Sequence, residues 1–308
     1  MNIKGFFSRF FSRGPDPEKD TPTEALTPPG EQVSPFADLK PEEPDASLAS
    51  DRQAKDVFLL NRISSGPRDT VGLYYPKLGT ILIRDPYEAK AGRLLRCSTG
   101  ADFQPLWGDW DGDGIESFGL FDSENARFWI WGINTGEQPE RNFMMGMAGQ
   151  QWVGIVGDWQ GSGKDGIGVY DPSTSFYWLQ NEAEGGHTST VVMFGATGKG
   201  WIPLAGDWNG DGKDGIGAFD PTNKLFFLRN TLSTGLHEIL LRADAALPDS
   251  IPIVGDWNGD GADEVGLFNA KDQQFILYPD LGDPDRTETF DFGPRGVEGR
   301  PFSVRWML

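Results

Sequence analysis

The sequence has little of several residue types that define common functional classes. Its 308 residues include one cysteine, Cys97, and two histidines, His187 and His237. A single cysteine cannot build a disulfide framework, so nothing supports an oxidising compartment. No stretch approaches the roughly 20 apolar residues that a membrane-spanning helix needs. Neither histidine has a recognisable partner motif, and the sequence therefore predicts a protein that is not an enzyme.

Basic residues are also far fewer than acidic ones. There are 27 lysines and arginines against 46 aspartates and glutamates, which gives a formal net charge of −19 at pH 7. Such a charge repels phosphate backbones, so nucleic acid is excluded as a partner. Paired acids serve glycosidases, but most acids here recur in phase with a repeat. That phase assigns them to turns that bind metal rather than to a catalytic pair.

The sequence is organised by a motif, GDW followed by a Gly- and Asp-rich turn, that occurs four times. It starts at Gly108, Gly157, Gly206 and Gly255, and its tryptophans are 49 residues apart. One more step of 49 reaches Trp306, near the end of the chain. A fixed period of this length indicates a repeat architecture.

Each repeat contains four short strand signals and no helical periodicity. In the third repeat these are residues 202–208, 216–219, 225–229 and 239–242, separated by Gly-, Asp- and Pro-rich turns. The third strand is apolar on both faces, which is typical of a sheet that is covered on both sides. Four-stranded sheets that stack around an axis give this burial, so each repeat is interpreted as a β-propeller blade.

The two ends of the repeat region predict how the ring closes. Residues 70–84 match the second and third strands of the unit, and residues 301–306 match a first strand with nothing after it. Pairing these segments gives an all-β, five-bladed β-propeller over residues 70–308, closed by the C-terminal strand. Residues 58–63 also align as a first strand, but only residues 301–306 are in phase with the other four copies.

The turn that begins at the Asp of each GDW, counted as position 1, places oxygen-bearing side chains at positions 1, 3, 5 and 8. Position 6 is glycine. Hard oxygen ligands in a tight loop suit Ca²⁺, and glycine permits the bend. The candidate ligands are Asp109, Asp111, Asp113 and Glu116; Asp158, Ser162 and Asp165; Asp207, Asn209, Asp211 and Asp214; and Asp256, Asn258, Asp260 and Asp263. We expect two to four structural calcium ions. The alternative is a set of plain Asx turns.

The motif GDWNGDGKDGIGAFDP, which starts at Gly206, resembles the FG-GAP and VCBS-type propeller repeats that include the calcium-binding blades of integrin α-subunits. The resemblance implies a propeller with calcium between the first and second strands of a blade. The family pattern has a carboxylate at position 9, whereas here that position holds Ser117, Gly166, Gly215 and Glu264. Members of the family serve adhesion, ligand binding or structure, so the resemblance does not fix a function.

The segment before the repeats has a different character. Residues 1–14 carry three basic residues, no acid, and Phe6, Phe7, Phe10 and Phe11 at helical spacing. A basic amphipathic helix of this kind suits a membrane surface or a protein partner; an organellar transit peptide is a third interpretation. It lacks the features of a cleavable secretory signal. Residues 15–50 are rich in proline and acids and predict a disordered or extended tether; residues 51–69 connect it to the propeller.

Two functions remain open at this point. The first is a calcium-stabilised scaffold subunit, attached through residues 1–50 to a membrane-associated complex or to the membrane itself, on the cytoplasmic side. The second is a secreted carbohydrate-binding or adhesive module, extracellular, with a glycan as partner. The N-terminus favours the first, because it pairs a basic Phe-rich segment with no export signal.

Overall fold

The computed structural model describes residues 68–85, 92–96, 103–131 and 139–305. The predicted helix at 1–14, the tether at 15–50 and nearly all of the connecting segment at 51–69 lie outside these residues, as do Cys97 and Trp306. Within the described part, strands are separated by turns, with one short 3-10 helix at Pro76–Leu78. The same residues contain no helix that is long and apolar enough to span a membrane.

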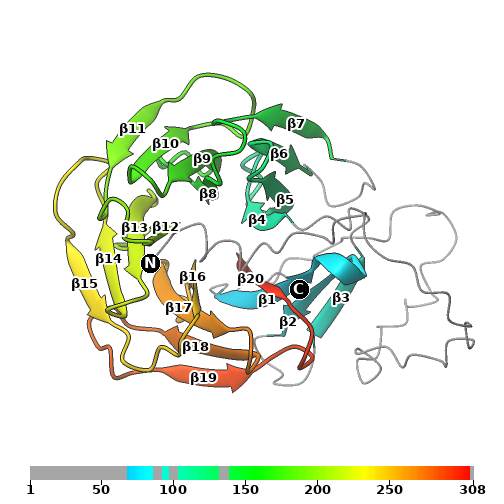
Figure 1. Cartoon of the computed structure of the whole chain (residues 1–308), viewed down its shortest axis with the longest axis vertical. Coiled ribbons are helices and arrows are strands. Elements are labelled where there is room, and N and C mark those ends of the chain that lie inside the picture. Colours follow the sequence, from blue (N-terminus) through cyan, green and yellow to red (C-terminus); the bar gives the residue numbers. More distant parts are fainter. Residues whose placement is uncertain (1–67, 86–91, 97–102, 132–138, 306–308) are drawn as a thin grey trace, which may run out of the picture.

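The strands form five antiparallel sheets of four, arranged around a central axis (Figure 1). The strands of each blade are given from the axis outward. The first blade is β20 (Arg300–Arg305), β1 (Asp69–Tyr75), β2 (Thr80–Arg84) and β3 (Gly92–Arg96), and the second is β4 (Gln104–Gly108), β5 (Ser117–Asp122), β6 (Arg127–Ile130) and β7 (Arg141–Met144). The third is β8 (Val153–Gly157), β9 (Gly166–Asp171), β10 (Phe176–Gln180) and β11 (Thr190–Met193); the fourth is β12 (Ile202–Gly206), β13 (Gly215–Asp220), β14 (Leu225–Arg229) and β15 (Ile239–Arg242); and the fifth is β16 (Ile251–Gly255), β17 (Glu264–Asn269), β18 (Gln274–Tyr278) and β19 (Glu288–Asp291). The predicted five-bladed propeller is confirmed.

The C-terminal strand closes the ring, as the repeat phase predicts. Strand β20 pairs antiparallel with β1, with Thr70 opposite Val304 and Gly72 opposite Phe302. It fills the innermost place of the first blade, for which residues 58–63, outside the described residues, were the alternative. The five innermost strands, β4, β8, β12, β16 and β20, each contact the next one around the axis. The GDW turns therefore all emerge at the same end of the inner strands, on one face of the disc.

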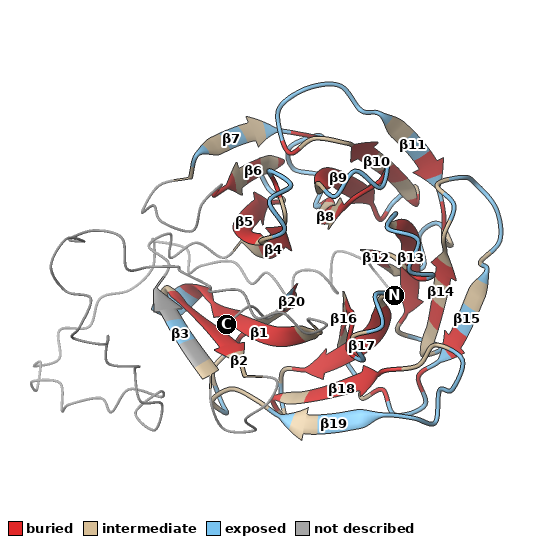
Figure 2. Cartoon of the chain, turned by 180° about the vertical axis from the view of Figure 1, so that it is seen from behind, coloured by how far each residue is buried: buried red, intermediate tan, exposed pale blue. Residues whose placement is uncertain are grey.

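The core lies between neighbouring blades. Each second strand from β5 to β17 is buried along its whole length, and the outermost strands show alternating exposure (Figure 2). Tyr177 of the third blade, for example, packs in one cluster with Ile216 and Ala218 of the fourth. Stacking of neighbouring sheets thus covers both faces of the second strands. The third strands, for which the sequence predicted this, instead alternate between buried and partly exposed residues in β6 and β14.

This packing explains the glycine and the tryptophan of the GDW motif. The indole of Trp159 is 6% exposed and folds back over Gly157, where an added Cβ would lie 2.8 Å from the ring. Its Nε1 donates a hydrogen bond to the Ile167 carbonyl at 3.3 Å. The same arrangement recurs at Trp208, which donates to Ile216. Tryptophan therefore anchors each turn in the core, and the preceding glycine leaves room for its ring.

The remaining tryptophans also serve packing at the blade boundaries. Trp152 stacks on Trp178 with ring centroids 4.7 Å apart, and Trp201 stacks on Phe227 at 4.4 Å. Phe103 and Trp129 make the equivalent pair in the second blade at 4.8 Å. These parallel stacks bury large apolar area.

We predict that closure by β20 depends on Phe302. Its ring is 6% exposed, stacks on Trp107 at 5.1 Å and fills the space above Gly72. Replacement by alanine (Phe302→Ala) should lower the free energy of unfolding by about 3–5 kcal/mol, because it leaves a cavity at the ring closure. Leu236→Ala is the control: this side chain is 81% exposed and its loss should change stability by less than about 0.5 kcal/mol. Urea denaturation compares the two, and equal effects would contradict the prediction.

Candidate metal loops and the carboxylate ring

The first side chain of each GDW turn organises the backbone of the turn. In the first loop, the two carboxylate oxygens of Asp109 accept hydrogen bonds from the N–H groups of Gly112 and Gly114, each at 2.7 Å. Both glycines have positive φ, +78° and +83°, a conformation that glycine adopts without steric cost. The turn wraps around this carboxylate and directs the position 3 and position 5 side chains to the same side.

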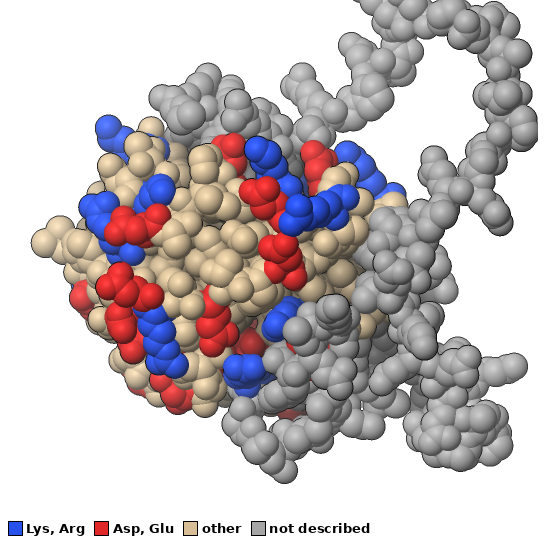
Figure 3. Space-filling model, turned by 90° about the horizontal axis from the view of Figure 1, so that it is seen from below, with Lys and Arg blue, Asp and Glu red and all other residues tan. Residues whose placement is uncertain are grey.

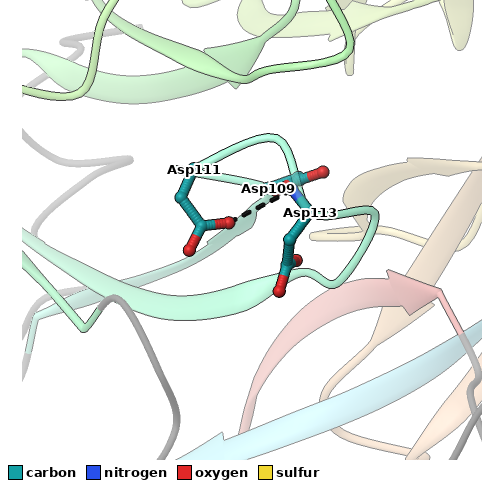
Figure 4. A group of neighbouring side chains, drawn as sticks. All are labelled: Asp109, Asp111 and Asp113. Carbon is teal, nitrogen blue, oxygen red and sulfur yellow. Dashed lines mark hydrogen bonds between the residues drawn. The ribbon is translucent and has the colours of Figure 1, made fainter.

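Three carboxylates meet in the first loop. Asp109, Asp111 and Asp113 each place one oxygen within 4.8 Å of the others (Figure 4). Two oxygens bound to opposite sides of a Ca²⁺ ion, each at roughly 2.4 Å from it, would be about 4.8 Å apart. A carboxylate has about four lone-pair positions, so Asp109 retains acceptor capacity while it holds the turn. The donor set and its spacing fit a hard divalent cation.

The fourth loop brings together a second triad, but with a different third member. Asp256 and Asp260 converge with Glu264, at position 9, rather than with the predicted Asp263. Glu264 is 3% exposed and accepts hydrogen bonds from the Trp257 N–H at 3.0 Å and the Asn258 amide at 2.5 Å. Burial, with the added repulsion of Asp260 and Asp256, raises the pKa of Glu264 to about 8. Position 9 carries a carboxylate in the FG-GAP and VCBS-type pattern that these turns resemble, and this is the sequence signal that points to Glu264.

The second and third loops are poorer in charge. In the second loop, the Ser162 hydroxyl donates to Asp158 at 3.3 Å. In the third loop, the Asn209 amide donates to Asp211 at 3.1 Å, and Asp207 accepts from the Gly212 N–H at 2.7 Å. Both turns have the same backbone form as the first, and neither brings three acidic side chains together among the described residues.

The position 8 acids turn away from their own loops. Asp165 of the second loop accepts a hydrogen bond at 2.7 Å from the N–H of Asp109, the position 1 residue of the preceding loop, and its own N–H donates back to the Asp109 carbonyl at 2.8 Å. We call the hydrogen bond that the acid accepts from the preceding loop a loop latch; at Asp165 a backbone bond in the other direction accompanies it. Asp214 makes the same latch by accepting a hydrogen bond from the N–H of Asp158 at 2.6 Å. Asp263 accepts one from the N–H of Asp207 at 2.8 Å.

Two further residues complete the ring of latches across the closing blade. Asp69, at the start of β1, accepts from the N–H of Asp256 at 3.0 Å and donates to its carbonyl at 2.8 Å. Glu116 of the first loop accepts at 3.0 Å from the N–H of Arg305, the residue that takes the position 1 place in β20. Sequence reasoning missed Asp69, although it precedes Gly72 by three residues as Asp214 precedes Gly217.

The five latch acids, Asp69, Glu116, Asp165, Asp214 and Asp263, form an electrostatically strained ring. Burial and neighbouring carboxylates raise the pKa of Asp165 and of Asp263 to about 7 and that of Glu116 to about 8. Arg305 lies next to this ring, with Nε 3.6 Å from Asp69 Oδ1. Although burial lowers the pKa of Arg305, the charges of Asp69 and Glu116 raise it above its usual range.

Comparisons with known proteins add little to this picture. No protein-family model and no curated protein matches the sequence. Among solved structures, an Agrocybe aegerita lectin that recognises non-reducing terminal N-acetylglucosamine is similar over 79% of this chain and 72% of that chain, at 15% identity and a TM-score of 0.43. A Staphylococcus aureus virginiamycin B lyase (77% and 74% covered, 8% identity, TM-score 0.39) and a chain of the mitotic checkpoint complex (88% and 75%, 11%, 0.37) are also similar. At these values the fold rests on the chain's own five sheets.

We predict that the metal-free protein loses stability as pH rises. The raised pKa values of Asp165 and Asp263 mean that the folded state retains protons that the unfolded chain, with carboxyl pKa near 3.9, has already released. The free energy of unfolding in EDTA should therefore fall between about pH 4 and pH 7. Denaturation curves across this range measure the slope.

The amide variants Asp165→Asn and Asp263→Asn provide the control for this slope. Each keeps a side-chain oxygen for the latch but removes the titrating charge, so each should flatten the pH dependence. A free energy of unfolding that rises with pH in EDTA would contradict the assignment of these carboxyls to the ring.

Proposed function

We propose that this protein is a non-catalytic, calcium-stabilised β-propeller that acts as an interaction scaffold and is attached through its N-terminal residues to a membrane surface or a multi-subunit assembly. The observation that carries the calcium part is the pair of acidic triads, Asp109–Asp111–Asp113 and Asp256–Asp260–Glu264. Carboxylates this close repel one another unless a cation neutralises them. The resemblance of the turns to FG-GAP and VCBS-type repeats supports the same assignment.

Bound calcium would supply positive charge and fixed oxygen coordination in each loop. The residues that would hold it are Asp109, Asp111 and Asp113 in the first loop, and Asp256, Asn258, Asp260 and Glu264 in the fourth. The loops lie between two strands of a rigid blade, and their position 1 residues are tied to the neighbouring blade by latches. Calcium in such a place would stiffen the disc rather than move one part of it against another.

The surface supports a protein partner more than a nucleic acid. On the side of the disc shown in Figure 3, basic and acidic side chains lie interspersed among uncharged ones. Exposed ion pairs such as Arg295–Asp291 at 2.9 Å add little stability, but they keep such a surface soluble and selective. Residues 1–14, which lie outside the described residues, carry Lys4, Arg9 and Arg13 and no acid, beside Phe6, Phe7, Phe10 and Phe11.

A carbohydrate-binding or adhesive module is the second candidate. The stacked pairs Trp152–Trp178 and Trp201–Phe227 recur at equivalent places in successive blades, and Trp178, Trp201 and Phe227 retain some exposure. Aromatic rings of this kind offer the flat apolar faces on which sugars stack. Saturable binding on a glycan array, lost in Trp201→Ala, would favour this function over the scaffold.

We predict that isothermal calorimetry with the full chain detects two tight calcium sites. Asp111→Asn should remove one and Asp260→Asn the other, because each substitution takes a charged ligand from a triad. Asp244→Asn is the matched control: it removes an exposed acid, in a weak ion pair with Arg242, that lies outside the GDW turns. Two sites that persist in both loop variants would refute the triads as ligands.

We predict that the N-terminal residues carry the attachment. In a pull-down from native membranes, the full chain should recover a defined complex or lipid, whereas a chain starting at Asp51 should not. A full-length variant with Phe6, Phe7, Phe10 and Phe11 replaced by serine keeps Lys4, Arg9 and Arg13, and so separates apolar anchoring from charge. Equal recovery by all three proteins would exclude residues 1–50 as the docking element.

A further inference from the structure

The closing blade is built differently from the other four. In those blades, a GDW turn joins the innermost strand to the next one along the chain. In the first blade, β20 comes from the C-terminal end and β1 from the other end of the propeller, so no loop connects them. Their register extends over six residue pairs, from Asp69–Arg305 to Tyr74–Arg300. The seam between β20 and β1 is held by non-covalent contacts alone.

Loops from both neighbouring blades hold this seam. On one side, Asp69 exchanges two hydrogen bonds with the backbone of Asp256, at 2.8 and 3.0 Å, and forms an ion pair with Arg305 at 3.6 Å. On the other side, Glu116 accepts a hydrogen bond from the Arg305 N–H at 3.0 Å. Arg305 thus bonds to the first loop through its backbone and pairs with Asp69 through its guanidinium.

The two loops that reach the seam are the two with acidic triads. Asp256 uses its backbone to bond Asp69 and its carboxylate to face Asp260 and Glu264. Glu116 follows the Asp109–Asp111–Asp113 triad within the same loop. The second and third loops, which lie away from the seam at boundaries where the chain is continuous, have no such triad among the described residues.

We propose that calcium in the first and fourth loops controls closure of the ring, and that Asp69 and Glu116 transmit its effect to the seam. This inference rests on the proposed calcium binding. A cation in each triad would fix the loop, and with it the Asp256 backbone that bonds Asp69 and the Glu116 carboxylate that bonds Arg305. Without the cation, repulsion within the triads loosens both loops, and β20 separates first because no covalent link restrains it. By linkage, closure of the seam in turn strengthens calcium binding.

Hydrogen–deuterium exchange of the full chain, followed by mass spectrometry, tests this coupling. Chelation of calcium should speed exchange in β20 by at least about tenfold, while β12 changes by less than about twofold, because local opening exposes only the released strand. Equal protection of β20 and β12 in both conditions, or equal loss, would overturn the inference. Calorimetry on the same sample separates failure of the proposed function from failure of this inference. If no calcium binds, both fail; if calcium binds but does not protect β20, only the coupling between calcium and the seam is overturned.

Variants of Asp69 test the transmitting residue. Asp69→Ala should reduce the calcium dependence of β20 exchange to the part that Glu116 transmits from the first loop. It should also weaken calcium binding at the fourth loop by about tenfold, a typical effect of losing one charge-assisted hydrogen bond. Asp69→Asn retains an oxygen acceptor and should restore part of both. Asp214→Ala breaks the same latch at a boundary where the chain is continuous, and should leave the calcium dependence of β20 in place. The inference is overturned if Asp214→Ala and Asp69→Ala affect β20 alike, or if Asp69→Ala affects neither readout.

Discussion

The structure depends on one repeated contact, a side-chain carboxylate of one blade that accepts a hydrogen bond from the first residue of the preceding blade's turn. Hydrophobic burial holds neighbouring sheets together, but apolar packing is non-directional and does not by itself set their angular register. The latch does so, because it fixes a backbone N–H of one blade against a backbone segment of the next, as at Asp158 and Asp214. Five such contacts, the last two through Asp69 and Glu116, turn a row of blades into a closed ring.

This arrangement has an electrostatic consequence that is relevant to function. The latches gather carboxylates near the axis on the same face that carries the acidic turns, and Arg305 is the basic residue paired with them in the described structure. Burial, and after it the charge of Asp69, raises the pKa of Glu116 to about 8, so that such a face is unfavourable without cations. Calcium in the turns would offset this repulsion. The proposed scaffold role follows from that stiffness, since a rigid disc presents a fixed surface to its partners.

The sequence predicts the fold well because a propeller repeats one local solution. The 49-residue period, the strand signals and the in-phase segment before Trp306 were enough to predict five blades and the closing strand. The candidate site is less accessible to this reasoning. The phase placed Asp263 in its own loop, but only the structure shows that its carboxylate faces Asp207 of the neighbouring blade, while Glu264 completes the triad. Contacts between repeats depend on the direction of a side chain, which a one-dimensional pattern does not contain.

The most direct test of this account is a crystal structure of the calcium-bound protein, with the ions located by anomalous scattering. The account predicts ions in the first and fourth turns, ligated by Asp109 and Asp111 and by Asp260 and Glu264 at about 2.3–2.6 Å. In the same structure the carboxylates of Asp165 and Asp263 would stay hydrogen-bonded to the preceding loops. A carboxylate of Glu116 or Asp263 bound to the ion of its own loop would contradict the account, because the ring of latches would then be broken.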